Sequence, residues 1–274
     1  MAKIIAICNQ KGGTGKTTTT LSLASYLAIE NKRTLLIDLD PQSNATSGIG
    51  INKHSVTSSI YNVLHGYVTL ESVVVPTQID NLSLAPSNLD LTGAEVELVN
   101  VMSREYRLKK SMENMLVPYD FVLIDCPPSL GLLTVNALTA ADSVIIPIQC
   151  EYYALEGLSQ LMNTVNLIKE NLNNRLAIEG VLLTMADFRT NLTKEVIEEV
   201  NRFFGDKVYK TIIPRSIKLS EAPGFGKPIL LYDKNSIGAF AYQNLAKEVL
   251  GIFTQPLENK EVVMEEEQHG KEIR

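Results

Sequence analysis

Residues 9 to 20 read Asn-Gln-Lys-Gly-Gly-Thr-Gly-Lys-Thr-Thr-Thr-Thr, between an apolar strand-like segment, 4–7, and a helix-like segment, 18–30. A turn between a buried strand and a helix start directs several backbone N–H groups at one point, where the helix dipole adds positive charge. Such a point suits a phosphate. The alternative is a chance glycine-rich turn, but the flanking segments and the two lysines agree with a phosphate-binding loop.

The loop predicts binding of ATP and magnesium. Lys16 can neutralise the β and γ phosphates, and the hydroxyl of Thr17 can bind Mg²⁺, as in a Walker A loop. The ordinary pattern would place a glycine where this chain has Gln10, and a second lysine, Lys11, opens the loop instead. The residues expected to contact the nucleotide here are Lys11, Gly12, Gly13, Thr14, Gly15, Lys16, Thr17 and Thr18.

Composition sets limits on the function. A chain of 274 residues with 45% hydrophobic content can bury a large core. Its net charge of −6 argues against a wholly basic nucleic-acid binder, so any DNA contact needs a local basic patch. No apolar run is long enough to span a membrane, and the chain enters a core strand without a signal-like leader. The separated cysteines and isolated histidines do not suggest a metal site.

Acidic residues end two predicted strands, 33–40 and 119–125. Carboxyl ends of parallel strands meet at one edge of a sheet, so we expect these acids beside the phosphate loop. Asp125 is predicted to belong to the outer shell of the magnesium ion. Asp40 is predicted to orient the attacking water or to hold a water of the magnesium shell. The alternative for Asp40, and more so for Asp38, is a carboxylate that caps the following turn.

The remaining pattern alternates strands with helices. The strands are apolar on both faces, which predicts an α/β fold with a mostly parallel twisted sheet and helices on both sides. We expect one domain over residues 1–253 and an acidic, disordered or loosely helical tail over 254–274. Further expected strands are 81–85, 143–148, 178–184 and 208–213; expected helices are 58–64, 70–73, 89–116, 151–168, 193–204 and 237–253; and 41–50 is expected to be a mobile loop.

Several motifs occur in a fixed order. After the phosphate loop come Asp-Leu-Asp-Pro-Gln (38–42), Ile-Asp-Cys-Pro-Pro-Ser-Leu-Gly (124–131), Cys-Glu-Tyr-Tyr-Ala-Leu-Glu-Gly (150–157), Arg-Thr-Asn-Leu (189–192), and Ile-Pro-Arg-Ser with Leu-Ser-Glu-Ala-Pro (213–223). Together they resemble the ParA/MinD class of P-loop ATPases with a deviant Walker A loop, and within it the chromosomal partitioning proteins of the ParA/Soj type. Ser43 stands where that family usually has glycine.

The resemblance implies an ATP-dependent homodimer in which Lys11 reaches the phosphates bound by the other subunit. It implies that 127–131 is a second switch loop, although a proline pair also makes a plain turn. Met185 and Pro214 would form the adenine pocket. Arg189, Arg215 and Lys218 would contact double-stranded DNA without sequence preference, although surface cations are usually only solvated. A ParB-type centromere-binding protein would stimulate hydrolysis, and the protein would be cytoplasmic and associated with the nucleoid.

Two other functions stay open at the sequence level. A MinD-like membrane-surface ATPase needs a basic amphipathic C-terminal helix, whereas this tail is rich in glutamate. No membrane partner is therefore expected. A small-molecule ligase on the same scaffold needs a second polar pocket for its acceptor, and no unassigned cluster of charged residues suggests one. The expected catalytic residues are accordingly those of ATP hydrolysis, namely Lys11, Lys16 and Asp40, with Thr17, Asp40 and Asp125 around the metal.

Overall fold

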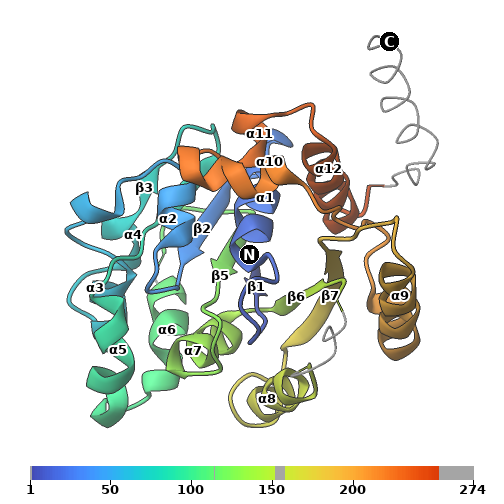
Figure 1. Cartoon of the computed structure of the whole chain (residues 1–274). Helices are drawn as coiled ribbons and strands as arrows, with labels where there is room; N and C mark the ends of the chain where they lie inside the picture. The colour runs from blue at the N-terminus through green and yellow to red at the C-terminus, as the bar shows by residue number, and fades with distance from the viewer. Residues whose placement is uncertain (1, 114, 152–157, 253–274) are drawn as a thin grey trace, which may run out of the picture.

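The computed structural model describes residues 2–113, 115–151 and 158–252. In this part of the chain, seven strands form one sheet in the order β3-β4-β2-β5-β1-β6-β7 (Figure 1). All neighbours are parallel except the β3–β4 pair at one edge. The mostly parallel α/β sheet predicted from the sequence is confirmed. The strands are β1 (Lys3–Ile7), β2 (Thr34–Asp38), β3 (Val75–Pro76), β4 (Leu82–Ala85), β5 (Phe121–Asp125), β6 (Ser143–Gln149) and β7 (Ala177–Thr184).

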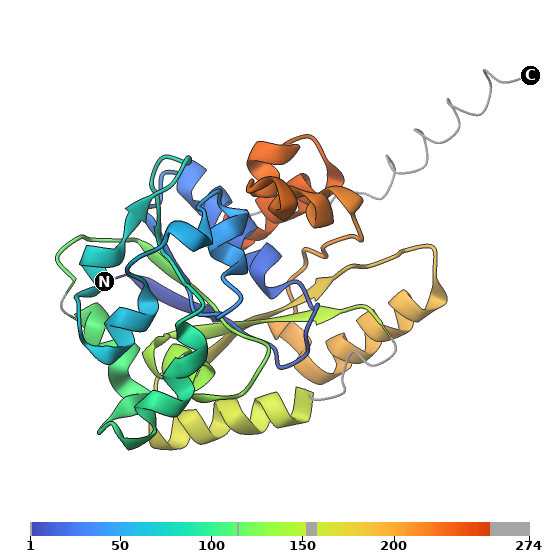
Figure 2. The same ribbon diagram turned by 60° about the vertical axis from the view of Figure 1, so that its left-hand side comes forward.

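Helices cover both faces of the sheet (Figures 1 and 2). Alternate residues of β1 show why: Ile5 and Ile7 pack with α1 and α12, whereas Ala6 and Cys8 pack with α7 and α8. The helices are α1 (Lys16–Ile29), α2 (Asn44–Gly48), α3 (Ile60–His65), α4 (Leu70–Val73), α5 (Leu91–Glu97), α6 (Arg107–Glu113), α7 (Leu132–Ala140), α8 (Leu158–Asn171), α9 (Asn191–Phe204), α10 (Ile217–Glu221), α11 (Ile229–Tyr232) and α12 (Ile237–Val249).

The single long helix predicted over 89–116 is wrong. The segment contains α5, two short 3₁₀ turns, 98–100 and 104–106, and then α6. Ser103, between the turns, has a left-handed backbone with φ 54°, which no helix continues. The predicted apolar stripe is divided accordingly, because Leu91 and Leu108 are buried while Val96 and Met102 are 76% and 91% exposed. The break divides the segment into two short helices, of which α5 packs against α3 and α6 packs against α3 and α7.

Smaller differences concern the ends and edges of elements. The predicted strand 208–213 is not a ladder strand; it makes one bridge, Val208 to Val181, and two backbone hydrogen bonds to β7. The predicted loop 41–50 contains the short helix α2. Most of the predicted helix entry at 151–157, residue 253 and the predicted tail lie outside the described residues. Among the described helices, none has the length and apolar content needed to cross a membrane.

The segment around α2 packs backbone to backbone against residues 222–226, which form a 3₁₀ turn, Ala222–Phe225, ending at Gly226. Gly226 has φ 61°, and a Cβ atom there would lie 3.1 Å from the Cα atom of Gly50 and 3.3 Å from the carbonyl oxygen of Ser47. A side chain at position 226 would therefore be both strained and crowded. This close approach joins the loop after β2 to the segment that carries α10.

We expect Gly226→Ala to lower the free energy of unfolding by about 1–3 kcal/mol, from backbone strain and crowding together. Two matched variants separate these causes. Gly251 has φ 70° with nothing within 4 Å of an added Cβ, so Gly251→Ala should cost about 1 kcal/mol from strain alone. Gly224 has an ordinary φ and open space, so Gly224→Ala should be neutral. Urea unfolding measures all three; an equal loss in Gly226→Ala and Gly251→Ala would rule out the crowding.

Candidate functional site

The phosphate loop lies between β1 and α1 with the geometry that a nucleotide requires. Gly13 and Gly15 have φ 75° and 86°, left-handed values that other residues adopt only with strain. Their turns place the first N–H groups of α1 at the mouth of the loop. The hydroxyl of Thr184, at the end of β7, donates to the carbonyl oxygen of Thr14 over 2.9 Å and holds the loop on the sheet.

The two lysines of the loop lie in different surroundings. Lys16 is 6% exposed, and its Nζ atom donates to the backbone carbonyl of Lys11 over 3.0 Å. Burial lowers the pKa of Lys16, and the nearby Asp125 opposes this effect. Lys11 is half-buried, and its backbone N–H donates to the side chain of Asn9, which is anchored to the carbonyl oxygen of Pro147. Among the described residues, the Nζ atom of Lys11 has no hydrogen-bond or acidic partner.

Asp125 is fully buried at the end of β5 and receives hydrogen bonds on both carboxylate oxygens. Thr17 donates to Oδ2 over 2.8 Å and Thr20 donates to Oδ1 over 2.9 Å. Because the Thr17 hydroxyl directs its proton at Asp125, its lone pairs remain for a cation in the loop. This arrangement fits magnesium, which takes few protein ligands and keeps waters and phosphate oxygens. Consistently, no group of three acidic, histidine or cysteine residues in the described chain forms a closed metal cage.

Two buried carboxylates lie side by side below the loop. Asp38 and Asp125 are register partners on β2 and β5, and both are fully buried. Burial raises the pKa of both groups, and Asp38 adds to the effect at Asp125 by charge repulsion. A cation beside them would favour their ionised forms, so the pair suits a magnesium ion and the ammonium group of Lys16.

Asp40 lies two residues beyond β2 and is 6% exposed. Its Oδ1 atom accepts the backbone N–H of Gln42 over 2.9 Å, so the turn-capping alternative describes part of its role. Its Oδ2 atom has no hydrogen-bond partner in the described chain. One carboxylate oxygen therefore shapes the turn while the other remains for a water, and the two roles weighed for Asp40 do not exclude each other.

The predicted adenine residues are neighbours. Met185 follows β7 with a left-handed backbone, φ 53°, and Pro214 forms a bridge with Ala186. The Cε atom of Met185 would lie 4.0 Å from a Cβ atom added at Gly15, so the side chain borders the loop.

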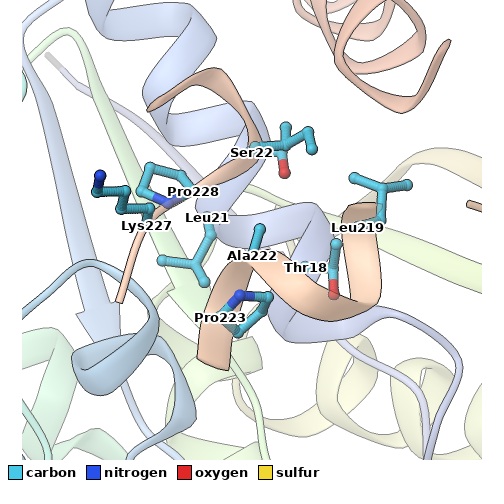
Figure 3. Close-up of a pocket in the computed structure, with 9 residues that line it drawn as sticks. Thr18, Leu21, Ser22, Leu219, Ala222, Pro223, Lys227 and Pro228 are labelled. Atoms are coloured by element: carbon cyan, nitrogen blue, oxygen red, sulfur yellow. The ribbon is translucent and has the colours of Figure 1, made fainter. Parts of the chain in front are cut away.

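A hollow on the other side of the loop is lined by Thr18, Leu21, Ser22, Leu219, Ala222, Pro223, Lys227, Pro228 and Ile229 (Figure 3). Its volume of about 10 Å³ is what a single water needs, so it is not a nucleotide site.

The predicted DNA-contact residues are exposed, and each carries an acidic partner. Arg189, 86% exposed, binds Asp187 through two nitrogens over 2.9 Å, and this contact lowers the pKa of Asp187 to about 2. Arg215 binds Glu151 over 3.0 Å. Lys218 binds Glu221 over 3.3 Å and lies 5.7 Å from the ring centre of Tyr232. Phosphate would have to compete with these carboxylates.

Sequence reasoning missed several groups that hold the site together. Thr20 could have been found, because residues three apart share a helix face and Thr17 was already directed at the metal. Thr184 and Asn9 carry no local signal, because their partners, Thr14 and Pro147, depend on which strands become neighbours. The Thr46 hydroxyl contacts Asp38, and the Ser87 hydroxyl contacts Asp40. These two contacts likewise carry no local sequence signal.

Comparison with known proteins identifies the family. Residues 2–178 match a family model described as an AAA domain. The chain is 59% identical over 249 residues to the sporulation initiation inhibitor protein Soj of Bacillus subtilis, covering 91% of this chain and 98% of Soj. It is 49% identical to the chromosome-partitioning ATPase Soj of Treponema pallidum, covering 91% and 98%. The chain belongs to the ParA/Soj family of P-loop ATPases.

A solved structure supports the nucleotide site of this ParA/Soj chain. Cobyrinic acid a,c-diamide synthase from Mycobacterium smegmatis, bound to an ATP analogue and magnesium, is 36% identical with a TM-score of 0.81, covering 91% of this chain and 95% of that one. Neighbours of this fold therefore bind magnesium and an adenine nucleotide.

Ser43 replaces the family's usual glycine and has a left-handed backbone, with φ 57° and ψ 36°. Its hydroxyl donates to the carbonyl oxygen of Pro41 over 3.3 Å, a long hydrogen bond. Left-handed geometry costs a serine on the order of 1 kcal/mol. A glycine at this position would adopt the same turn without that strain, so the substitution is strained although the fold accommodates it.

We therefore expect Ser43→Gly to raise the free energy of unfolding by roughly 0.5–1 kcal/mol. The control is Ser47→Gly, four residues along in α2, where the backbone is right-handed and glycine should cost about 0.5–1 kcal/mol. Urea titration of both variants tests this; a loss of stability in Ser43→Gly as large as that in Ser47→Gly would contradict the strain at position 43.

Proposed function

We propose that this protein is a DNA-segregation ATPase whose ATP-bound dimer binds DNA without sequence preference. A ParB-type partner then stimulates hydrolysis and releases it from DNA. One observation carries the proposal. The loop holds Lys16 among buried acids, yet leaves the ammonium group of Lys11 without a partner in the described part of its own subunit. A second subunit's triphosphate would supply that partner.

The proposed chemistry is in-line attack of water on the γ phosphate. Asp40 orients the water, with Oδ1 fixed by the Gln42 N–H and Oδ2 directed to the reaction. Lys16 and Lys11 stabilise the charge that develops on the phosphate oxygens. Thr17 would hold a magnesium ion, with Asp125 and Asp40 in its outer shell, and the bound ion would help to neutralise the same charge. Met185 and Pro214 are proposed to enclose the adenine. Because Lys11 would come from the partner, hydrolysis would depend on dimerisation.

DNA binding is proposed to use Arg189, Arg215 and Lys218. The cations are exposed and their acidic partners are only half-buried, so the ion pairs are weak and screened by salt. A duplex offers phosphates at close, regular spacing, and a dimer doubles the number of contacts. Binding should therefore require the dimer and fall steeply with salt. The nucleoid location follows from this proposal.

The similarity to the diamide synthase raises a second candidate function, that of a small-molecule ligase. The synthase name belongs to the neighbour, which shares 36% identity, against 59% for Soj over a similar share of the chain. A ligase would need a pocket for its acceptor beside the phosphates, and the hollow described beside α1 holds no more than a single water. DNA binding measured with ATP, with ADP and without nucleotide at several salt concentrations separates the functions. ATP-independent binding, or none, would overturn the proposal. ATP-dependent binding to anionic liposomes instead of DNA would favour the MinD-like alternative.

We expect Lys11→Ala to bind ATP in part but to lose ATP-dependent dimerisation, because the cross-subunit charge is gone. Size-exclusion chromatography with ATP measures this, and a nucleotide-binding titration reports the retained affinity. Lys169→Ala, on the exposed face of α8, removes the same charge away from the loop and should dimerise normally. Unchanged dimerisation of Lys11→Ala would refute the role of Lys11.

We expect Arg189→Ala to keep ATP-dependent dimerisation and to lower DNA affinity about tenfold. The slope of log affinity against log salt should fall by about one for each phosphate contact removed. Arg175→Ala is the matched control. Arg175 lies just before the start of β7, whereas Arg189 lies after its end, so the two residues are at opposite ends of this strand. Fluorescence anisotropy with a random duplex gives both values; equal affinities and slopes for the two variants would count against contact by Arg189.

A further inference from the structure

Asp38 is a buried carboxylate to which the proposed mechanism gives no role. Its Oδ2 atom accepts both the backbone N–H and the hydroxyl of Thr46, each over 2.7 Å. Its Oδ1 atom accepts the backbone N–H of Asp40 over 3.2 Å. Asp38 and Thr46 are both fully buried. One carboxylate therefore joins the end of β2 to the middle of α2 and holds Asp40 by its amide.

Ser87, two residues after β4, completes the arrangement from the other side. Its backbone N–H donates to the Thr46 hydroxyl over 3.0 Å, and its own hydroxyl donates to the carbonyl oxygen of Asp40 over 2.8 Å. Ser87 is also fully buried. The contacts form a closed ring from Asp38 through Thr46 and Ser87 to Asp40 and back to Asp38. Asp40 is thereby held at its N–H and at its C=O.

We propose that Asp38, Thr46 and Ser87 are positioning residues that fix the Asp40 carboxylate for hydrolysis. The inference rests on the proposed catalytic role of Asp40. Asp40 follows a strand rather than lying within one, so the sheet ladder alone does not hold its backbone. Orienting a water demands placement within about 0.5 Å, and an error near 1 Å can cost about 100-fold in rate. The ring supplies the missing constraint.

Thr46 is the central member because its hydroxyl donates to Asp38 and accepts from Ser87 at the same time. Serine can make both contacts, whereas valine, which has nearly the same shape, can make neither. Thr46 also lies on α2, within the segment 41–50 that directly follows Asp40. A shift of α2 would therefore reach Asp40 through one hydroxyl group.

The test compares steady-state ATP hydrolysis and ATP binding in Thr46→Val, Thr46→Ser and Ser87→Ala. We expect Thr46→Val to lower kcat by about 10- to 100-fold with KM within about threefold, since the phosphate loop is untouched. Thr46→Ser should restore kcat to within a few-fold of the original. Ser87→Ala removes only the hydroxyl on the Asp40 carbonyl, and should lower kcat by about 3- to 10-fold.

Thr46→Val leaves the buried Ser87 N–H without an acceptor and removes one of the two donors to Asp38 Oδ2, so its folding is checked by thermal unfolding; if it does not fold, Ser87→Ala decides the test. Normal kcat in every folded variant would overturn the proposal, as would equal losses in Thr46→Val and Thr46→Ser. Loss of ATP binding in place of kcat would also overturn it. Asp40→Ala is the reference: if it hydrolyses ATP normally, the role of Asp40 itself is refuted, whereas an inactive Asp40→Ala beside normal ring variants refutes only the positioning role.

Discussion

The structure depends on placing two carboxylates side by side where parallel strands end. Asp38 and Asp125 share a register position on β2 and β5, and neither is exposed. Like charges in a buried site repel, and burial alone costs each ion several kcal/mol. The cost is reduced by three hydroxyl donors from two elements: Thr17 and Thr20 on α1, and Thr46 on α2. Satisfying the acids therefore fixes the phosphate-loop helix and the segment after β2 relative to the sheet.

The same constraint explains why the site responds to charge. Lys16 is held beside the acids with a lowered pKa, because it too is buried. Magnesium and a triphosphate would bring one further cation and several anionic oxygens, which would satisfy the acids and the lysine together. Lys11 would gain nothing from this exchange within its own subunit. A unit charge a few ångströms from a phosphate is worth on the order of several kcal/mol at an effective dielectric near 20, before desolvation is subtracted. That is enough to make association conditional on ATP.

Sequence could predict whatever depends on neighbours along the chain. The sheet, the phosphate loop and the acidic strand ends follow from alternation, glycine spacing and residue type. The helix over 89–116 failed because an apolar stripe does not show where the backbone turns back, as it does at Ser103. The sequence gives turn capping more weight for Asp38 than for Asp40 but does not reveal its main partner, because the Thr46 hydroxyl is brought near only by α2. The strain at Ser43 was likewise invisible, since its cost arises from a left-handed turn.

The exposed cations pose a different problem, because each is already paired. A pair such as Arg189 with Asp187 lowers the carboxylate's pKa, yet both groups remain open to water, and salt weakens their attraction. Exchanging the pairing for a phosphate contact would therefore cost little, and in the proposed function it would weaken polyanion binding by a single subunit of a chain whose net charge is −6. Two subunits held in fixed relation would present these cations twice along one duplex, where the second contact no longer carries the entropy cost of association. In the proposed function, acidic partners on the surface and a nucleotide-dependent dimer would together restrict DNA binding to the time during which ATP is bound.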